Sequence, residues 1–201
     1  PWRLFSAHKV HMAPTRTWAK YLPAGRSAAE MMFDSGAFTA WKKGETYTLE
    51  QLLPAYDELL NLYDSRVAAC WLINLDVIPG RCGQASVSPE EIAAALDQSD
   101  RNFEALERRY GKRVLPVYHQ GESDERLEKV LDQNPAYIYI SPRNDFPEPR
   151  RVAFSLSSHR KLHSLGRSPM THGLGATGSK MLTSVPWGSV DSVTWCMTAN
   201  N

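Results

Sequence analysis

Residues 114–141 read VLPVYHQGESDERLEKVLDQNPAYIYIS and contain the pattern that decides the fold. Two short apolar runs, 114–120 and 137–141, flank a segment in which Ser123 can cap an amphipathic helix. The near-continuous apolarity of both runs indicates strands that are buried on both faces, as in a parallel sheet. A strand, a helix and a second strand in this order predict a parallel α/β unit.

The same alternation extends over the rest of the chain. Further strand-like runs are MMFD (31–34), VAACWLINLD (67–76), MTHGLG (170–175) and SVDSVTW (189–195), with a weaker run near Leu4–Ala7. Helices are expected from Thr48 with a capping box to Gln51, from Ser88 to a stop at Gly111, and over 158–165 and 179–184. Pro54 makes the first turns after Thr48 uncertain.

A barrel and an open doubly wound sheet both fit this alternation. No GxGxxG or GxxxxGK[ST] phosphate loop follows any of the strand-like runs, which weakens the nucleotide-binding open sheet. We therefore expect a (β/α)8 TIM barrel, shortened or incomplete, because 201 residues fall below the usual size of about 250. A chain of this length favours one catalytic domain over residues 1–201.

Cysteine usage and hydropathy place the chain among intracellular proteins. Cys70, Cys82 and Cys196 form no CxxC pair, which fits reduced thiols better than disulfides or a zinc site. No stretch reaches the length of about 20 apolar residues that spans a bilayer, and the first residues lack a signal-peptide core. We expect a cytoplasmic protein with no metal and no membrane contact.

The charges are unevenly distributed although the net charge is only +1. Residues 1–26 hold five basic and no acidic residues, residues 27–142 hold eleven against nineteen, and residues 143–201 hold seven against three. This distribution excludes a uniformly basic nucleic-acid binder but permits phosphate contacts on one side. Ordinary variation on a solvated surface explains it equally well.

Polar residues recur where the expected strands end. They are Asp34, Asp76, Gln120, Ser141, His172 and Asp191. In a barrel these ends converge on one face, which carries the active site. Each acid taken alone could be a helix cap or a turn former. Two carboxylates suit chemistry at a sugar anomeric carbon, and a third carboxylate with an amide could recognise a guanine-like edge.

The motif DSGAF (34–38) resembles the DSGGF-type motif of tRNA-guanine transglycosylases. Later segments follow in that family's order: LINLDVIPG (72–80), PVYHQGE (116–122), YIYISP (137–142), THGLGAT (171–177) and GSVDSVTW (188–195). The last four of these segments resemble, in the order given, the VQGG, GGL, MGVGTP and GVDMFDCV segments of the family. The resemblance spans residues 31–195 and implies a TIM barrel.

The resemblance implies a role for each matching residue. Asp191 would be the nucleophile on C1′ of the sugar, and Asp34 the general acid and base. The implied substrate-binding residues are Asp76 and Gln120 on the base edge, the backbone near Ser141, Phe38 as a stacking platform, Ser35 and Gly173. Phe38 could equally be a core residue, and the acids could be turn formers. His119 and His172 are further candidates for proton transfer, interpreted here as residues of the core or behind the site.

Departures from the family bear on the substrate. The tRNA enzymes carry a CxCxxC…H zinc subdomain after the barrel, whereas this chain shows no such pattern, and it has Ala37 and Ser141–Pro142 where they have glycine. The pattern is closer to phage-type relatives that insert 7-deazaguanines into DNA, which would place the protein in the host-cell cytoplasm. DNA is thus the preferred partner, tRNA the alternative, and a free 7-deazaguanine base such as preQ0 the second substrate.

A basic segment between two of the expected strands, residues 143–167, could hold the phosphate backbone. Its candidate residues are Arg143, Arg150, Arg151, Arg160 and Lys161. A solvated loop and helix face is the other interpretation. DNA would need base extrusion, because C1′ is inaccessible in a stacked duplex.

Four functions remain open at this point. Base exchange without a cofactor leads, and hydrolysis of the same intermediate by water needs the same residues. A noncatalytic nucleic-acid-binding barrel subunit and an unrelated sugar-processing barrel are the others. The oligomeric state is left open.

Overall fold

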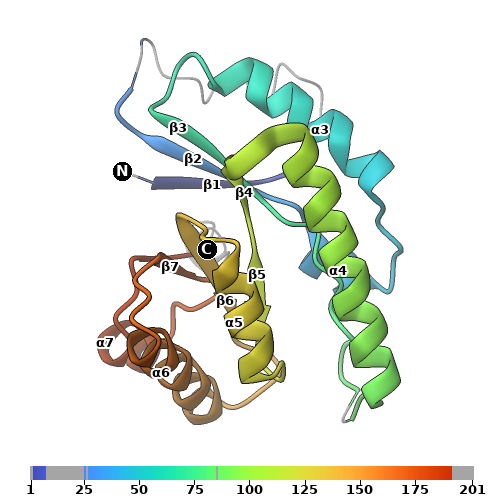
Figure 1. Ribbon diagram of the computed structural model, residues 1–201, viewed down its shortest axis with the longest axis vertical. Coiled ribbons are helices and arrows are strands. Elements are labelled where there is room, and N and C mark those ends of the chain that lie inside the picture. The colour runs from blue at the N-terminus through green and yellow to red at the C-terminus, as the bar shows by residue number, and fades with distance from the viewer. Residues whose placement is uncertain (1, 8–24, 26, 85, 192–201) are drawn as a thin grey trace, which may run out of the picture. The chain divides into compact units, whose positions relative to one another are not determined.

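A computed structural model describes residues 2–7, 25, 27–84 and 86–191. The chain divides into two compact units with the boundary between Val114 and Leu115. We call them the amino-terminal unit and the carboxyl-terminal unit; Figure 1 labels their elements. Both alternate strands with helices, so the α/β class with parallel sheets is confirmed.

The amino-terminal unit holds a sheet of order β1-β2-β3-β4. Its strands are β1 (Trp2–Ser6), β2 (Glu30–Asp34), β3 (Ala69–Ile73) and β4 (Val114–Leu115). β1 and β3 both pair with β2 in parallel. Its helices are α2 (Ala37–Lys43), α3 (Leu49–Tyr63), α4 (Pro89–Tyr110) and the 3-10 turn η2 (Gly111–Arg113).

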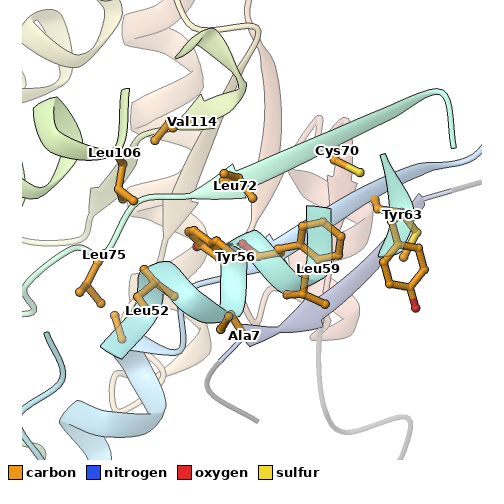
Figure 2. Packing of buried hydrophobic residues seen from close by; sticks show 14 of the residues in the cluster. Ala7, Leu52, Tyr56, Leu59, Tyr63, Cys70, Leu72, Leu75, Leu106 and Val114 are labelled. Atoms are coloured by element: carbon orange, nitrogen blue, oxygen red, sulfur yellow. Dashed lines mark hydrogen bonds between the residues drawn. The ribbon is translucent and has the colours of Figure 1, made fainter. Parts of the chain in front are cut away.

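The core of this unit forms where α3 and α4 pack on the sheet. Figure 2 shows Tyr56, Leu59 and Tyr63 of α3 beside Leu72 of β3 and Leu106 of α4. All five side chains are fully buried. The Tyr56 hydroxyl hydrogen-bonds the carbonyls of two neighbouring strands, so even this polar atom is satisfied.

The carboxyl-terminal unit holds the parallel sheet β5-β6-β7-β8. Its strands are β5 (Val117–His119), β6 (Tyr137–Ser141), β7 (Met170–Gly173) and β8 (Ser189–Val190). Its helices are α5 (Asp124–Asp132), α6 (Glu148–Ser164) and α7 (Ser179–Ser184). Ile138 and Ile140 pack with Leu127, Val130 and Leu162.

Most expected elements are confirmed. The capping box of α3 is present, since the Thr48 N–H donates to Gln51 Oε1 at 2.9 Å. Ser88 and Glu91 cap α4 in the same reciprocal way, at 3.1 and 3.0 Å. The run 114–120 is interrupted between β4 and β5 at Pro116, which has no N–H for a strand ladder.

Two helix expectations were wrong. α6 begins at Glu148, ten residues before the expected start at 158, because Pro149 fits the first turn of a helix and does not break it. α2 was not expected at all; it begins directly after Gly36, whose φ of 88° only glycine adopts readily. The last expected run continues past β8 into residues 192–195, which lie outside the described residues.

No helix in the part of the chain that the structure describes has the length and apolarity needed to cross a membrane.

Candidate functional site

The carboxyl ends of β1, β2 and β3 share one edge of the amino-terminal sheet. Ser6 is the register partner of Asp34, and Phe33 pairs with Leu72. Asp34 therefore ends its strand on the same edge as β3, and Asp76 follows β3 by three residues. Parallel α/β proteins bind ligands at this edge.

Asp34 lies in a turn that its own side chain stabilises. The Gly36 N–H donates to Asp34 Oδ2 at 3.2 Å, and the Ala37 N–H donates to the buried Ser35 Oγ at 3.4 Å. Burial, followed by the negative charge of Asp34, raises the pKa of Tyr47 to about 12. The turn-forming role of Asp34 is confirmed by its contact with Gly36, and its side chain is partly exposed at the strand end.

Phe38 is placed by α2 on the surface. Its side chain is 44% exposed, and its ring lies 5.8 Å from that of Trp41. The Phe38 ring is exposed and available for stacking, so the core interpretation of Phe38 is wrong.

The segment that carries Asp76 is held by α4. Ser99 accepts from the Val77 N–H at 2.8 Å with its Oγ, and Asn102 donates to the Leu75 carbonyl at 2.6 Å. Asn74 donates to the Ser99 carbonyl at 3.0 Å. Asp76 is only 9% exposed, so its carboxylate is largely enclosed.

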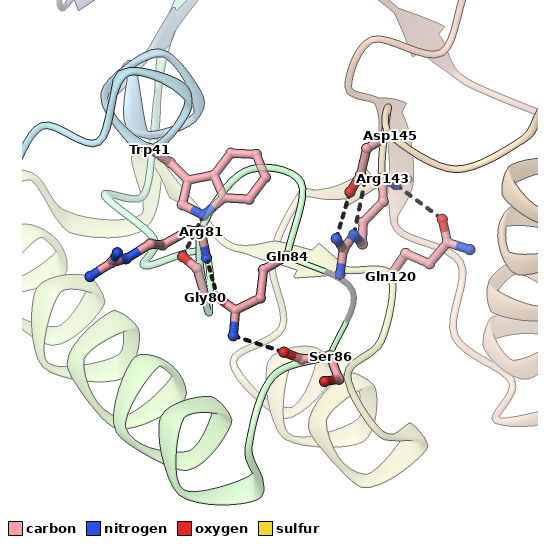
Figure 3. Close-up of polar contacts among 8 residues, drawn as sticks. All are labelled: Trp41, Gly80, Arg81, Gln84, Ser86, Gln120, Arg143 and Asp145. Carbon is pink, nitrogen blue, oxygen red and sulfur yellow. Dashed lines mark hydrogen bonds and ion pairs between the residues drawn. The ribbon is translucent and has the colours of Figure 1, made fainter.

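The loop after Asp76 is tied to α2. Trp41 Nε1 donates to the Gly80 carbonyl at 2.8 Å, as Figure 3 shows, and the Arg81 N–H donates to Gln84 Oε1 at 2.9 Å. Residues of this loop and of the first turn of α4 line an open depression. They are Arg81, Cys82, Gly83, Gln84 and Glu91.

The carboxyl-terminal sheet brings its own strand ends together. His119 pairs with Ser141, Ile140 pairs with Gly173, and Gly173 pairs with Val190. Gln120, Ser141 and Asp191 therefore lie along one edge, as the alternation of strands and helices predicts.

Asp191 is the most tightly held acid of this edge. Its Oδ1 lies 3.1 Å from His172 Nε2 and accepts from the Gly175 N–H at 3.1 Å. Its own N–H donates to the Gly173 carbonyl at 3.3 Å, and 26% of its side chain is exposed. An oriented carboxylate with one fixed oxygen and a route to solvent suits a nucleophile.

His172 is a direct partner of Asp191, closer than the sequence interpretation placed it. It is 2% exposed, its Nδ1 lies 2.8 Å from Ser189 Oγ, and its ring centre lies 4.6 Å from that of Tyr139. The only sequence signal for this contact is the alternation of Ser189 and Asp191, which puts both side chains on one face of the strand.

Gln120 organises the loop after β6. Its Oε1 accepts from the Arg143 N–H at 3.0 Å, as Figure 3 shows, and its Nε2 donates to the Arg150 carbonyl at 3.2 Å. Within the part of the chain that the structure describes, these two bonds leave one Nε2 hydrogen and one oxygen lone pair.

Gly173 is required by packing. A Cβ at this position would lie 2.7 Å from Ala176 Cβ and 3.0 Å from the Trp187 ring. Only glycine lets the strand end approach these side chains closely.

The basic residues divide into two groups. Arg143 and Arg150 each place a guanidinium over the ring of Phe146, with Cζ 4.5 and 3.8 Å from the ring centre. Arg151 donates to the Gly175 carbonyl at 2.9 Å. The hydrogen bonds of Arg143 lower the pKa of Asp145.

The other group lies at the far end of α6. Arg160 and Lys161 are about ten residues further along this helix, or about 15 Å from Arg150. Lys161 pairs with Glu128 at 2.7 Å. The structure therefore brings Arg143, Arg150 and Arg151 to the edge that carries Asp191, but not Arg160 and Lys161.

Among the described residues, no cluster of His, Cys, Asp and Glu could hold a metal ion. Comparisons of the chain with protein-family models, with curated proteins and with solved structures find no match.

Proposed function

We propose that the protein is a transglycosylase that exchanges guanine in DNA for a 7-deazaguanine base such as preQ0. The observation that carries this proposal is the Asp191 carboxylate, whose Oδ1 is fixed by His172 and Gly175 at a strand end. The motif order from DSGAF onward is its second support.

The reaction consists of two displacements at C1′ of the target nucleotide. An Asp191 oxygen bonds C1′ while the bond to guanine N9 breaks, and Asp34 donates the proton that the leaving base takes up. The incoming base then loses a proton to Asp34 and bonds C1′ as the aspartyl ester breaks. Two inversions retain the anomeric configuration, and no electron is transferred.

The mechanism requires both units to form one catalytic domain, a shortened TIM barrel. Helices separate β2 from β3, β3 from β4, and each successive pair of strands from β5 to β8. In a TIM barrel the active site is built at the carboxyl ends of the strands, which is where Asp34 and Asp191 lie in their own sheets.

Recognition of the base is assigned to residues of both edges. Asp76 and the free capacity of Gln120 would bind the guanine edge, the backbone at Ser141 and Gly173 would line it, and Ser35 would support the turn at Asp34. Phe38 supplies an exposed stacking face.

Covalent trapping tests the reaction. Incubation with single-stranded DNA followed by denaturation should give a protein–DNA adduct, which Asp191→Asn should lower at least about 1,000-fold because an amide is a poor nucleophile. Asp132→Asn, at the surface end of α5, is the matched control and should leave the adduct unchanged. Full adduct formation by Asp191→Asn would disprove the nucleophile.

The fate of the adduct separates the related functions. Guanine release that depends on added preQ0 indicates exchange, whereas release in its absence indicates hydrolysis. Parallel reactions with tRNA, followed by mass analysis of the nucleosides, decide between the two nucleic acids. A protein that binds DNA but forms no adduct is a noncatalytic binder.

DNA contact by the basic group at the edge has a separate test. Arg150→Glu should weaken DNA binding and flatten its dependence on salt, since one phosphate contact is lost. Arg160→Glu makes the same charge change at the other end of α6 and should have the smaller effect. Equal effects of both variants would contradict a contact localised at the edge.

A further inference from the structure

His172 lies within a polar row that crosses the second sheet. It pairs in register with Tyr139 of β6 on one side and with Ser189 of β8 on the other. Its ring contacts Tyr139, and its two nitrogens contact Ser189 and Asp191 at 2.8 and 3.1 Å. Each polar edge of the ring is thus matched, which fixes its orientation.

The partners determine where the ring carries its proton. An ionised carboxylate can only accept hydrogen bonds, so the hydrogen shared with Asp191 Oδ1 belongs to His172 Nε2. Nδ1 faces the Ser189 hydroxyl, which can donate to a bare ring nitrogen or accept from a protonated one. This arrangement satisfies all three side chains with a single tautomer.

We propose that His172 is a positioning residue for the reaction. With the Gly175 N–H it holds Asp191 Oδ1 and leaves Oδ2 as the oxygen that bonds C1′. Arg151 extends this support, because it donates to the Gly175 carbonyl at 2.9 Å. The inference rests on the proposed function in taking Asp191 as the nucleophile.

Ser189, His172 and Asp191 are also the residue types of a hydrolase triad, in which the serine attacks. Their places in the fold argue against that role. Ser189 is the first residue of β8, beside the buried His172, whereas Asp191 follows the last residue of the strand, at the edge where parallel α/β proteins bind ligands. The serine therefore orients the ring, and the acid attacks.

Two substitutions of His172 separate positioning from packing. His172→Phe keeps a ring against Tyr139 but removes the donor, and it should form the trapped adduct about 100-fold more slowly, as expected for a misplaced reacting group. His172→Gln offers an amide N–H near the place of Nε2 and should recover most of that rate. Circular dichroism and DNA affinity should be unchanged in both variants.

Ser189→Ala distinguishes the serine's role. Loss of the hydroxyl should slow adduct formation less than His172→Phe does, because Nε2 still reaches Asp191. A loss as large as that of Asp191→Asn would make Ser189 the nucleophile and overturn the proposal. If His172→Phe formed the adduct as fast as the wild-type protein, the positioning role of His172 alone would be overturned.

A spectroscopic measurement checks the contact without any turnover. Nitrogen NMR of protein labelled with ¹⁵N-histidine should show His172 protonated on Nε2, and Asp191→Asn should shift that signal more than any other histidine signal. A ring protonated on Nδ1 and bare at Nε2 would overturn the inference. Absence of adduct with the wild-type protein would instead overturn the proposed function, so the two failures are distinct.

Discussion

The acids of the amino-terminal unit are held by a local turn and by α4, whereas Asp191 of the carboxyl-terminal unit is also contacted by a side chain of the neighbouring strand. Asp34 is bonded by the N–H of its own turn, and the segment of Asp76 is bonded by α4. Asp191 receives an imidazole from β7 and the N–H of Gly175.

The difference shows what each sheet can tolerate in its interior. The first sheet packs against an apolar and aromatic core that includes Tyr56 and Leu59 of α3. The second sheet carries Thr171, His172 and Ser189 within its strands, and their hydrogen bonds to each other and to neighbouring groups compensate for burial. Both units have an apolar core, and the second adds a row of polar contacts within its sheet.

The largest effect is expected for the apolar core. Leu59→Ala removes a fully buried side chain from under the first sheet and should cost about 2–5 kcal/mol of unfolding free energy. Leu182→Ala, at a leucine that is 44% exposed, should cost less than about 0.5 kcal/mol. Urea unfolding measures both, and similar costs would refute the buried packing shown in Figure 2.

A smaller effect is expected where α4 holds the segment of Asp76. Asn102→Ala leaves the Leu75 carbonyl without its donor in a buried place and should cost about 1–3 kcal/mol. Gln98→Ala, whose side chain is exposed and bonds only Asn102 and Arg101 among the described residues, is the control and should cost less than about 0.5 kcal/mol. If Asn102→Ala left the free energy of unfolding unchanged, the contact with α4 would not be needed to hold the segment of Asp76.

The smallest effect is a dependence on pH in the second unit. Burial lowers the pKa of His159, whose nitrogens contact the Ser155 carbonyl and Thr171 Oγ at 2.8 and 3.1 Å. The unfolded chain therefore binds this proton more readily than the folded one. The contribution of neutral His159 to the free energy of unfolding is fully present above about pH 6.5. It is lost as the pH falls through the lower pKa that His159 has in the folded protein.

Thermal unfolding between pH 7 and 5 measures this dependence. His159→Gln keeps polar contacts without titrating, so its melting temperature should fall less over that range than that of the wild-type protein. Parallel curves for the two proteins would show that His159 is not linked to stability.

Much of the fold was predictable because its signals are local. Ser88, Pro89 and Gly111 determine the ends of α4 through cap and turn preferences that act within a few residues. The start of α6 was missed since prolines at 147 and 149 permit both a loop and a first helical turn. Asp34 and Asp191 were found because strand-end acids follow apolar runs.

The sequence by itself determined the α/β alternation, the strand ends at which acids lie, and the turn that holds Asp34. Tertiary structure alone decided that His172 reaches Asp191 and Ser189, and that Gln120 bonds the backbone of the loop after β6. The reason is physical: caps and turns depend on neighbours along the chain, whereas these contacts depend on the register of strands joined by long connections.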